Sequence, residues 1–237
     1  MQLKFLTWPD IEEYLKRDDR IILPLGSTEQ HGPRAVFGTD HLIPEAIAKE
    51  VAERTGTIVA PTMAYGMSIH HMEFKGSVTL RPSTMIPFFR DLLWSFQQGG
   101  FKRVLILNGH GGNRNTVEAM LSEVGNELLD MKIKFRSWWE AEGVKNYLDE
   151  HFGEQEGHHG SPSETSQIMF LYPGVVKDRE TEYRPMIWGK YFINKKTFPK
   201  LYPDGLMGSD PSLASEKHGE NIYNLCVNGF VKEMDEW

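Results

Sequence analysis

Short apolar runs alternate with amphipathic segments along the chain. Runs of aliphatic and β-branched residues predict buried strands at 20–25, 57–61, 104–107 and 133–138. Apolar residues at helical spacing predict helices at 10–17, 42–54, 85–99, 114–130, 164–171 and 212–234. Strands that alternate with helices in this way are typical of an α/β fold with a mostly parallel sheet.

Residues 177–211 interrupt the alternation. They are rich in Pro, Tyr, Phe and Lys and have little periodicity, so we interpret them as a long ordered excursion, either an active-site lid or a subunit contact. No repeat, low-complexity tract or Ser/Gly linker divides the sequence. We therefore expect one domain that spans 1–237.

Composition removes several classes of protein. The chain has 237 residues and one cysteine, which excludes an internal disulfide framework and a thiolate metal cage. Its formal net charge of −7 argues against a general nucleic-acid binder. No apolar run approaches the roughly 18 residues of a membrane span. Residues 1–10 lack a secretory signal pattern, so we expect a cytoplasmic protein.

The histidines are clustered rather than scattered. Seven of the nine fall in four short segments, as His31 and His41, His70 and His71, His110, and His158 and His159. This clustering points to a site, because three of the segments follow predicted strands and ligands bind at the carboxyl ends of strands in parallel sheets.

The first segment, residues 26–41, follows the first strand. Glu29 and His31 are two residues apart, so in an extended chain both side chains point the same way. Asp40 opens the next helix, where an Asp is usually an N-cap. Two carboxylates and an imidazole suit a divalent ion. The alternative for Glu29 and His31 is a merely solvated loop.

The second segment, residues 108–113, follows the third strand. Its glycines allow a sharp turn that holds His110 at the edge of the sheet. A phosphate cradle is a competing interpretation, but the segment lacks the GK[ST] ending of a P-loop. The structural alternative is a glycine turn with an incidental histidine.

The third segment, residues 158–166, leads into a helix. Glu164 falls in the first turn, where a capping role is the alternative to ligand binding. His159 could act as an acid or base because its pKa is ordinarily near neutral. Serine nucleophile chemistry is weakly supported, since no G-x-S-x-G elbow is present. In the fourth segment, residues 65–77, Tyr65 and His71 could line the same pocket. The alternative is that they belong to an ordinary surface loop.

Together these segments place five oxygen and nitrogen ligands at one edge of the sheet: Glu29, His31, Asp40, His110 and Glu164. Three of the five are carboxylates, which is more than one catalytic zinc usually takes. The set is sufficient for two ions that share a carboxylate, roughly 3.5–4 Å apart, and such a pair activates a bridging water.

The same segments resemble a known family. GSTEQHGP followed by GTD, then NGHGGN, then H-G-x-x-x-E-T-S, are similar to motifs of the creatininase family of metal-dependent amidohydrolases. Residues 65–76 resemble the family's YGxSxEHxxFPG segment, and residues 208–219 resemble its GDPxxAxxEKG segment. The resemblance covers about residues 20–220, and the order of five motifs is highly specific.

The resemblance implies a single three-layer α/β/α domain with two divalent ions, commonly Zn or Mn, with Fe also possible. Glu29, Asp40 and His110 would bind one ion, and His31, Asp40 and a further carboxylate would bind the other. His159 matches the family histidine that acts in proton transfer. Members often assemble as hexamers, so the resemblance implies a homo-oligomer.

The sequence departs from true creatininases in its pocket. Those enzymes resemble NGHYEN in the second motif, where Glu is a ligand, whereas this chain has Gly112. Glu164 is our candidate for the missing ligand, with a catalytic role as well. The family Glu before the catalytic histidine is replaced by His158. Trp138 and Trp139 follow the fourth strand, where creatininases place a tryptophan near substrate; the alternative is a core position.

We therefore expect a hydrolase that opens an amide or cyclic amide, other than a peptide bond, in a small molecule by a dinuclear metal-activated water. The resemblance also leaves a peptidase that trims a modified precursor peptide, or a formamide hydrolase. A non-catalytic metal-binding or nucleotide-binding module is the alternative from another class. We expect neither nucleic-acid nor membrane partners.

Overall fold

The computed structural model describes residues 1–187 and 192–237. Within them the sheet has four parallel strands in the order β2-β1-β3-β4. The strands are β1 (Arg20–Leu25), β2 (Ile58–Val59), β3 (Arg103–Asn108) and β4 (Lys132–Ser137). Leu25 pairs with Asn108, and Asn108 pairs with Ser137, so three strands end level with one another. The predicted parallel α/β sheet is confirmed.

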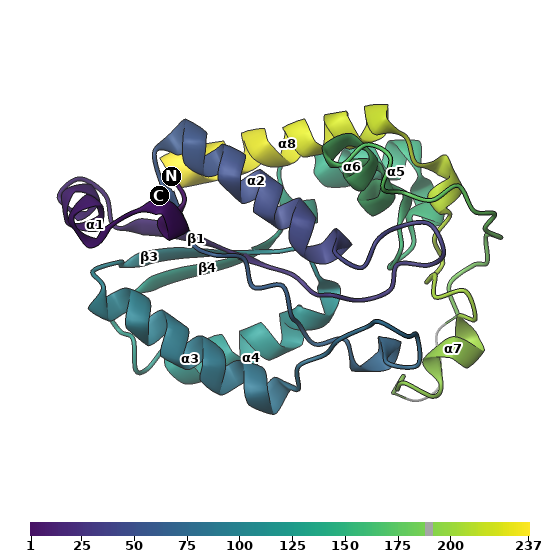
Figure 1. Cartoon of the computed structure of the whole chain (residues 1–237), viewed down its shortest axis with the longest axis horizontal. Coiled ribbons are helices and arrows are strands. Elements are labelled where there is room, and N and C mark those ends of the chain that lie inside the picture. Colours follow the sequence, from purple (N-terminus) through teal and green to yellow (C-terminus); the bar gives the residue numbers. More distant parts are fainter. Residues whose placement is uncertain (188–191) are drawn as a thin grey trace.

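Helices cover both faces of this sheet (Figure 1). The α-helices are α1 (Trp8–Leu15), α2 (Thr39–Thr55), α3 (Pro82–Gln98), α4 (Arg114–Val124), α5 (Val144–His151), α6 (Pro162–Leu171), α7 (Phe198–Leu201) and α8 (Glu216–Asp235). Figure 1 shows α3 and α4 on one side and α2, α5, α6 and α8 on the other. The molecule therefore has the three α/β/α layers that the family resemblance implies.

Alternating side chains of the central strands supply both halves of the core. In β3, Val104 and Ile106 join the buried cluster beneath α3 and α4, while Leu105 and Leu107 join the cluster beneath α2 and α8. Successive side chains of a strand point to opposite faces, which explains this division. A strand buried on both faces reads as a continuous apolar run, as residues 104–107 do.

Some predicted boundaries differ from the structure. Helix α5 was not predicted, because eight residues with two buried positions, Val144 and Leu148, are too short for a clear helical period. The helix predicted at 114–130 ends at Val124, next to Gly125, a residue of low helix propensity. These differences leave the strand ends, and the side chains after them, in their predicted places.

Part of the predicted excursion, 177–211, packs against the outside of the strand-end loops. The Phe198 ring is fully buried, and its centroid lies 4.6 Å from that of His71. The carbonyl of Gly205 accepts a hydrogen bond from the Gln30 side chain at 2.9 Å. Residues 188–191 of the excursion lie outside the described residues. The prediction that 177–211 is a lid or a subunit contact stays a prediction.

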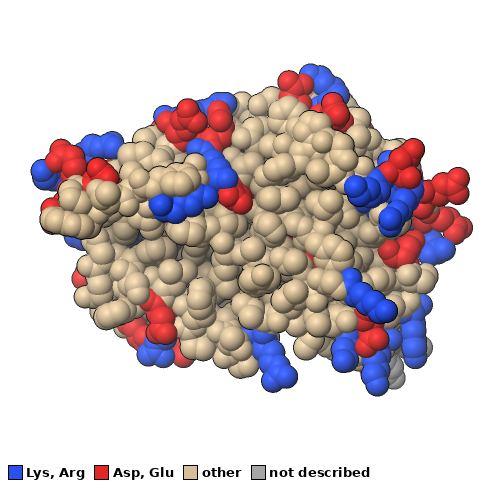
Figure 2. Space-filling view, in the orientation of Figure 1, with Lys and Arg blue, Asp and Glu red and all other residues tan. Residues whose placement is uncertain are grey.

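Surface charge is mixed on the face shown in Figure 2, where cationic and anionic side chains alternate around the margin and the centre is largely uncharged. None of the helices within residues 1–187 and 192–237 is long and apolar enough to cross a membrane.

Truncation in the central strand should cost far more stability than truncation at the surface. Leu105 is fully buried and Leu129 is 79% exposed. We expect Leu105→Ala to lower the free energy of unfolding by about 2–5 kcal/mol, because it leaves a cavity. Leu129→Ala should change it by less than about 0.5 kcal/mol. Denaturant unfolding measures both, and equal losses would contradict the assigned core.

Candidate metal centre

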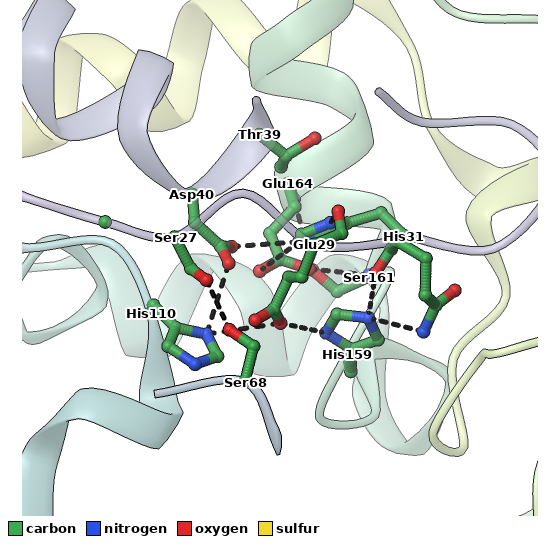
Figure 3. Close-up of polar contacts among 12 residues, drawn as sticks. Ser27, Glu29, His31, Thr39, Asp40, Ser68, His110, His159, Ser161 and Glu164 are labelled. Atoms are coloured by element: carbon green, nitrogen blue, oxygen red, sulfur yellow. Dashed lines mark hydrogen bonds and ion pairs between the residues drawn. The ribbon is translucent and has the colours of Figure 1, made fainter. Parts of the chain in front are cut away.

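Three strand-end loops and the start of α6 meet at the carboxyl edge of the sheet (Figure 3). The loop after β1 carries Glu29 and His31, and the loop after β3 carries His110. Gly109 donates its backbone N–H to the Leu25 carbonyl at 2.8 Å, which ties the two loops together. The parallel topology thus brings these distant residues to one place.

Glycines allow α2 to approach these loops closely. A Cβ at Gly26 or Gly109 would overlap the backbone of Asp40. Asp40 is the second residue of α2, whose N-cap is Gly38. Its side chain is therefore not the helix N-cap; it is directed at His31 and His110 (Figure 3).

Asp40 connects two groups of candidate ligands. In one, His110 Nδ1 lies 3.1 Å from Asp40 Oδ2 and 3.2 Å from Glu29 Oε1. In the other, His31 Nε2 lies 2.8 Å from Asp40 Oδ1 and 3.9 Å from Glu164 Oε1. Within each group the ligand atoms lie within 4.8 Å of one another, close enough to hold one ion. The five residues predicted as ligands are therefore brought together.

Glu164 combines two roles that the sequence left as alternatives. Its Oε2 accepts hydrogen bonds from the Ser161 backbone N–H at 2.9 Å and from Ser161 Oγ at 3.0 Å, which completes a capping box at the start of α6. The other oxygen, Oε1, faces His31. Capping therefore fixes the side chain and leaves one oxygen for the centre.

The carboxylates of the centre are incompletely satisfied. Both oxygens of Glu29 and Oδ2 of Asp40 are buried and accept no hydrogen bond from any described residue. Buried carboxylate oxygens without partners are costly, and a bound cation removes that cost. The donor set, of carboxylates and imidazoles, suits zinc and manganese.

Hydrogen bonds fix which nitrogen of each ligand histidine faces the centre. His110 Nε2 lies 3.0 Å from the Met67 carbonyl oxygen, and His31 Nδ1 lies 3.1 Å from the Glu29 carbonyl oxygen. A carbonyl accepts only, so these nitrogens carry the protons. The opposite nitrogen of each neutral ring then directs a lone pair at the carboxylates, which is the usual arrangement of metal-binding histidines.

The same electrostatics set the pKa values of the metal-free protein. Burial alone would lower the pKa of His31, but the adjacent Asp40 carboxylate raises it to about 10. Burial likewise opposes protonation of His110, and Glu29 and Asp40 together raise its pKa to about 9. Burial raises the pKa of Glu164. Protons therefore occupy the histidines when no cation is bound.

His159 differs from these two histidines. Its Nε2 lies 2.6 Å from the Gln30 carbonyl oxygen, and its Nδ1 lies 3.5 Å from Glu29 Oε1. Burial and the neighbouring rings of His71 and His31 hold its pKa well below the usual range. His159 is therefore neutral near pH 7 and able to accept a proton. With Glu29 and His31 it also forms a third group of possible ligands.

A cavity of about 760 Å³ opens onto the centre. Four of the residues predicted for the pocket line it, namely His71, Trp138, Trp139 and His158. Tyr65 is not among the described residues that line the cavity, and 51% of its surface is exposed. Tyr65 therefore shares a motif with His71 but not the cavity wall.

Two residues near the centre were missed or undervalued in the sequence. Glu156 lines the cavity, accepts a hydrogen bond from Ser163 Oγ, and has its pKa raised to about 7 by burial. No motif marks this residue. His71 was predicted only as pocket wall, yet its Nε2 lies 3.2 Å from Glu29 Oε1. Neither contact follows from sequence spacing.

A methyl group added at Gly109 should weaken metal binding, whereas one added at Gly111 should not. A methyl at Gly109 would overlap the Asp40 carbonyl and lie 2.7 Å from Pro44 Cδ, whereas at Gly111 it would meet no described atom within 4 Å. We expect Gly109→Ala to weaken zinc binding at least about tenfold, because it displaces Asp40. Competition with a chelator measures this, and equal affinities of the two variants would contradict it.

Metal affinity should also rise with pH. An ion needs neutral imidazoles, while the metal-free protein holds protons on His31 and His110 up to about pH 10 and pH 9. Binding therefore releases protons, and apparent affinity should increase about tenfold per pH unit for each proton displaced. Calorimetric titration of the metal at about pH 7, 8 and 9 measures how the apparent affinity changes with pH. An affinity that does not change with pH would refute this linkage.

Comparison with known proteins is consistent with this geometry. The family model for creatininase (creatinine amidohydrolase) matches residues 4–234. Creatinine amidohydrolase of Pseudomonas putida is 28% identical over 98% of this chain and 95% of its own length. A mycofactocin precursor peptide peptidase of Mycolicibacterium smegmatis is 28% identical over 92% of this chain and 85% of its own length.

Solved structures show the same relationship. A tryptophan-to-phenylalanine mutant of creatininase (Type II) superposes with a TM-score of 0.89 and 28% identity over 99% of this chain and 97% of that chain. The Mn form of creatininase matches with a TM-score of 0.87 and 27% identity. A mutant creatininase of the Zn–Zn type matches with a TM-score of 0.86 and 28% identity. Both matches cover 99% of this chain and 97% of the matched chain. The resemblance seen in the motifs is confirmed, and this chain belongs to the creatininase family.

Proposed function

We propose that the protein is a metal-dependent amidohydrolase that opens an amide or cyclic amide bond, other than a peptide bond, in a small molecule. The observation that carries the proposal is Asp40, a buried carboxylate shared by two groups of ligand-type side chains. Family membership supports the reaction class.

The residues present fit two divalent ions. Glu29, Asp40 and His110 would hold one ion, and His31, Asp40 and Glu164 the other, with Asp40 bridging. The buried oxygens of Glu29 and Asp40 that accept no hydrogen bond are the atoms that a bound cation would neutralise. Bound there, two ions would supply Lewis acidity for a carbonyl and a water acidic enough to react near neutral pH. Zinc or manganese is favoured by the related Zn–Zn and Mn creatininases, with iron also possible.

His159 would move the proton. Its neutral ring can accept a proton at Nδ1 from the attacking water and donate it to the leaving nitrogen as the amide opens. The hydrogen bond from Nε2 to the Gln30 carbonyl keeps the ring oriented. Glu164, held by the α6 capping box, would keep one oxygen at the centre during these steps.

The surrounding side chains would bind and shield the substrate. Trp138 and Trp139 lie nearly perpendicular, with ring centroids 5.3 Å apart, and present aromatic surface to the cavity. His71 and His158 would complete the wall on the same cavity. An apolar wall beside charged ligands limits the access of bulk water, which strengthens electrostatic interactions with a bound amide.

A second candidate function is peptide hydrolysis. A cavity of about 760 Å³ lies in the upper part of the range for drug-sized ligands and exceeds the needs of a single small ring. The relatives described as mycofactocin precursor peptide peptidases favour the same reading. Parallel assays on small lactams and short peptides separate the two functions.

The wider setting of the activity follows from the family resemblance. We propose that residues 1–237 form one creatininase-like domain and that the protein works as a homo-oligomer, a hexamer by resemblance. A cytoplasmic location agrees with the lone cysteine, which suits a reducing compartment.

Removal of the shared carboxylate should abolish both metal binding and turnover. We expect Asp40→Asn to lose most of both ions and nearly all hydrolysis, since each ligand group contains Asp40. The exposed Asp130→Asn is the matched control. Elemental analysis and an amide-substrate panel provide the readouts; a fully metallated Asp40→Asn protein would count against the assignment.

Loss of His159 should separate chemistry from metal binding. We expect His159→Gln to retain two ions while kcat falls about 10²–10⁴-fold, the usual contribution of general acid–base catalysis. Metal content and kcat are measured on the same preparation. A variant that loses an ion instead would make His159 a ligand and not the proton carrier.

A further inference from the structure

The side chain of Gln30, which lies between two candidate ligands, has a fixed orientation. Its Oε1 accepts from the Gly32 backbone N–H at 2.8 Å, and its Nε2 donates to the Gly205 carbonyl at 2.9 Å. A backbone N–H can only donate and a carbonyl can only accept. These two contacts therefore decide which end of the amide is nitrogen.

That orientation determines the tautomer of His71. The Gln30 Nε2 lies 2.9 Å from His71 Nδ1. An amide nitrogen cannot accept, so His71 Nδ1 must be the acceptor and the ring proton must sit on Nε2. Gln30 Nε2 also lies 3.1 Å from His159 Nε2. However, His159 Nε2 carries a proton, which it donates to the backbone carbonyl of Gln30 at 2.6 Å.

His71 thus presents a proton where the other histidines present lone pairs. Its Nε2 lies 3.2 Å from Glu29 Oε1, and the two residues are 1% and 0% exposed. By contrast, His110 and His159 donate from Nε2 to carbonyls and face Glu29 through Nδ1. Of these three rings, only His71 cannot offer a lone pair to an ion beside Glu29.

We propose that His71 is a positioning residue that orients Glu29 towards the ion shared with Asp40 and His110, without binding that ion itself. The proposal rests on the metal centre of the proposed function. A neutral ring N–H that faces a buried carboxylate oxygen at 3.2 Å attracts it as a dipole attracts a charge, which favours one orientation of the Glu29 side chain. Partners of this kind typically contribute 10–100-fold to metal affinity.

Residues 198–205 of the excursion hold this arrangement from outside. The Phe198 ring packs edge-on against His71, and the Gly205 carbonyl anchors Gln30. Gly205 has a φ of +84°, and a Cβ there would overlap Gln30 Oε1. The proposal therefore gives this segment a role in metal binding, although it supplies no ligand in the described residues.

Direct substitution tests the contact between His71 and Glu29. Zinc is titrated into metal-free wild type, His71→Leu and His71→Gln in the presence of a competing chelator, and two dissociation constants are fitted. We expect His71→Leu to weaken one ion about 10–100-fold and to leave the other unchanged. His71→Gln should recover most of the loss, because its amide N–H can take the place of the ring N–H that faces Glu29.

A matched pair of glycine substitutions tests whether the contact between Gly205 and the Gln30 side chain supports metal binding. Gly174 also has a φ of +84°, but a Cβ there would meet no described atom within 4 Å. Alanine at either position therefore takes the same unfavourable φ, and only Gly205→Ala should disturb Gln30. We expect Gly205→Ala to weaken the same ion as His71→Leu, while Gly174→Ala retains wild-type affinities.

The outcomes separate the two proposals. A wild type that binds no zinc would overturn the metal centre and, with it, the role of His71. A wild type with two ions, matched by His71→Leu or by Gly205→Ala, would overturn the role of His71 alone. If His71→Leu does not fold, as judged by thermal unfolding, the glycine pair decides the question.

Discussion

The burial of the Asp40 carboxylate is the constraint on which the rest of the site depends. A charge removed from water must be compensated by opposite charge or by hydrogen bonds. Here His31 and His110 approach from two different loops, and the N-terminus of α2 adds a favourable dipole. One oxygen, Oδ2, still accepts no hydrogen bond from the described residues. The local structure is therefore arranged around a positive charge that the side chains only partly supply.

The fold meets this constraint through close backbone packing. Parallel strands end together, so the loops that follow β1 and β3 lie side by side, and glycines at 26 and 109 let α2 approach them. The capping box of α6 adds Glu164 with one oxygen already occupied. The excursion that contains Phe198 and Gly205 supports Gln30 and His71 from outside. Elements distant in sequence thus fix the orientation of a few carboxylates.

The sequence was sufficient to predict the parallel sheet and the gathering of the five candidate ligands at one edge of it. The run 104–107 is apolar because both faces of β3 are buried, and three of the four histidine-bearing segments follow strands. The sequence was insufficient where contacts between distant residues determine which side chains line the cavity and where a histidine carries its proton. Tyr65 shares a motif with His71 but does not line the cavity within the described residues. Likewise, the proton on His71 depends on a carbonyl at Gly205, which is 175 residues from Gln30. No local pattern contains that relationship.

The central claim is that two ions share Asp40, and anomalous X-ray diffraction tests it most directly. Crystals of the protein loaded with zinc or manganese would be measured on both sides of the absorption edge of the metal. We expect two anomalous peaks roughly 3.5–4 Å apart, with Asp40 between them, Glu29 and His110 at one, and His31 and Glu164 at the other. A single peak, or a pair that Asp40 does not bridge, would contradict it.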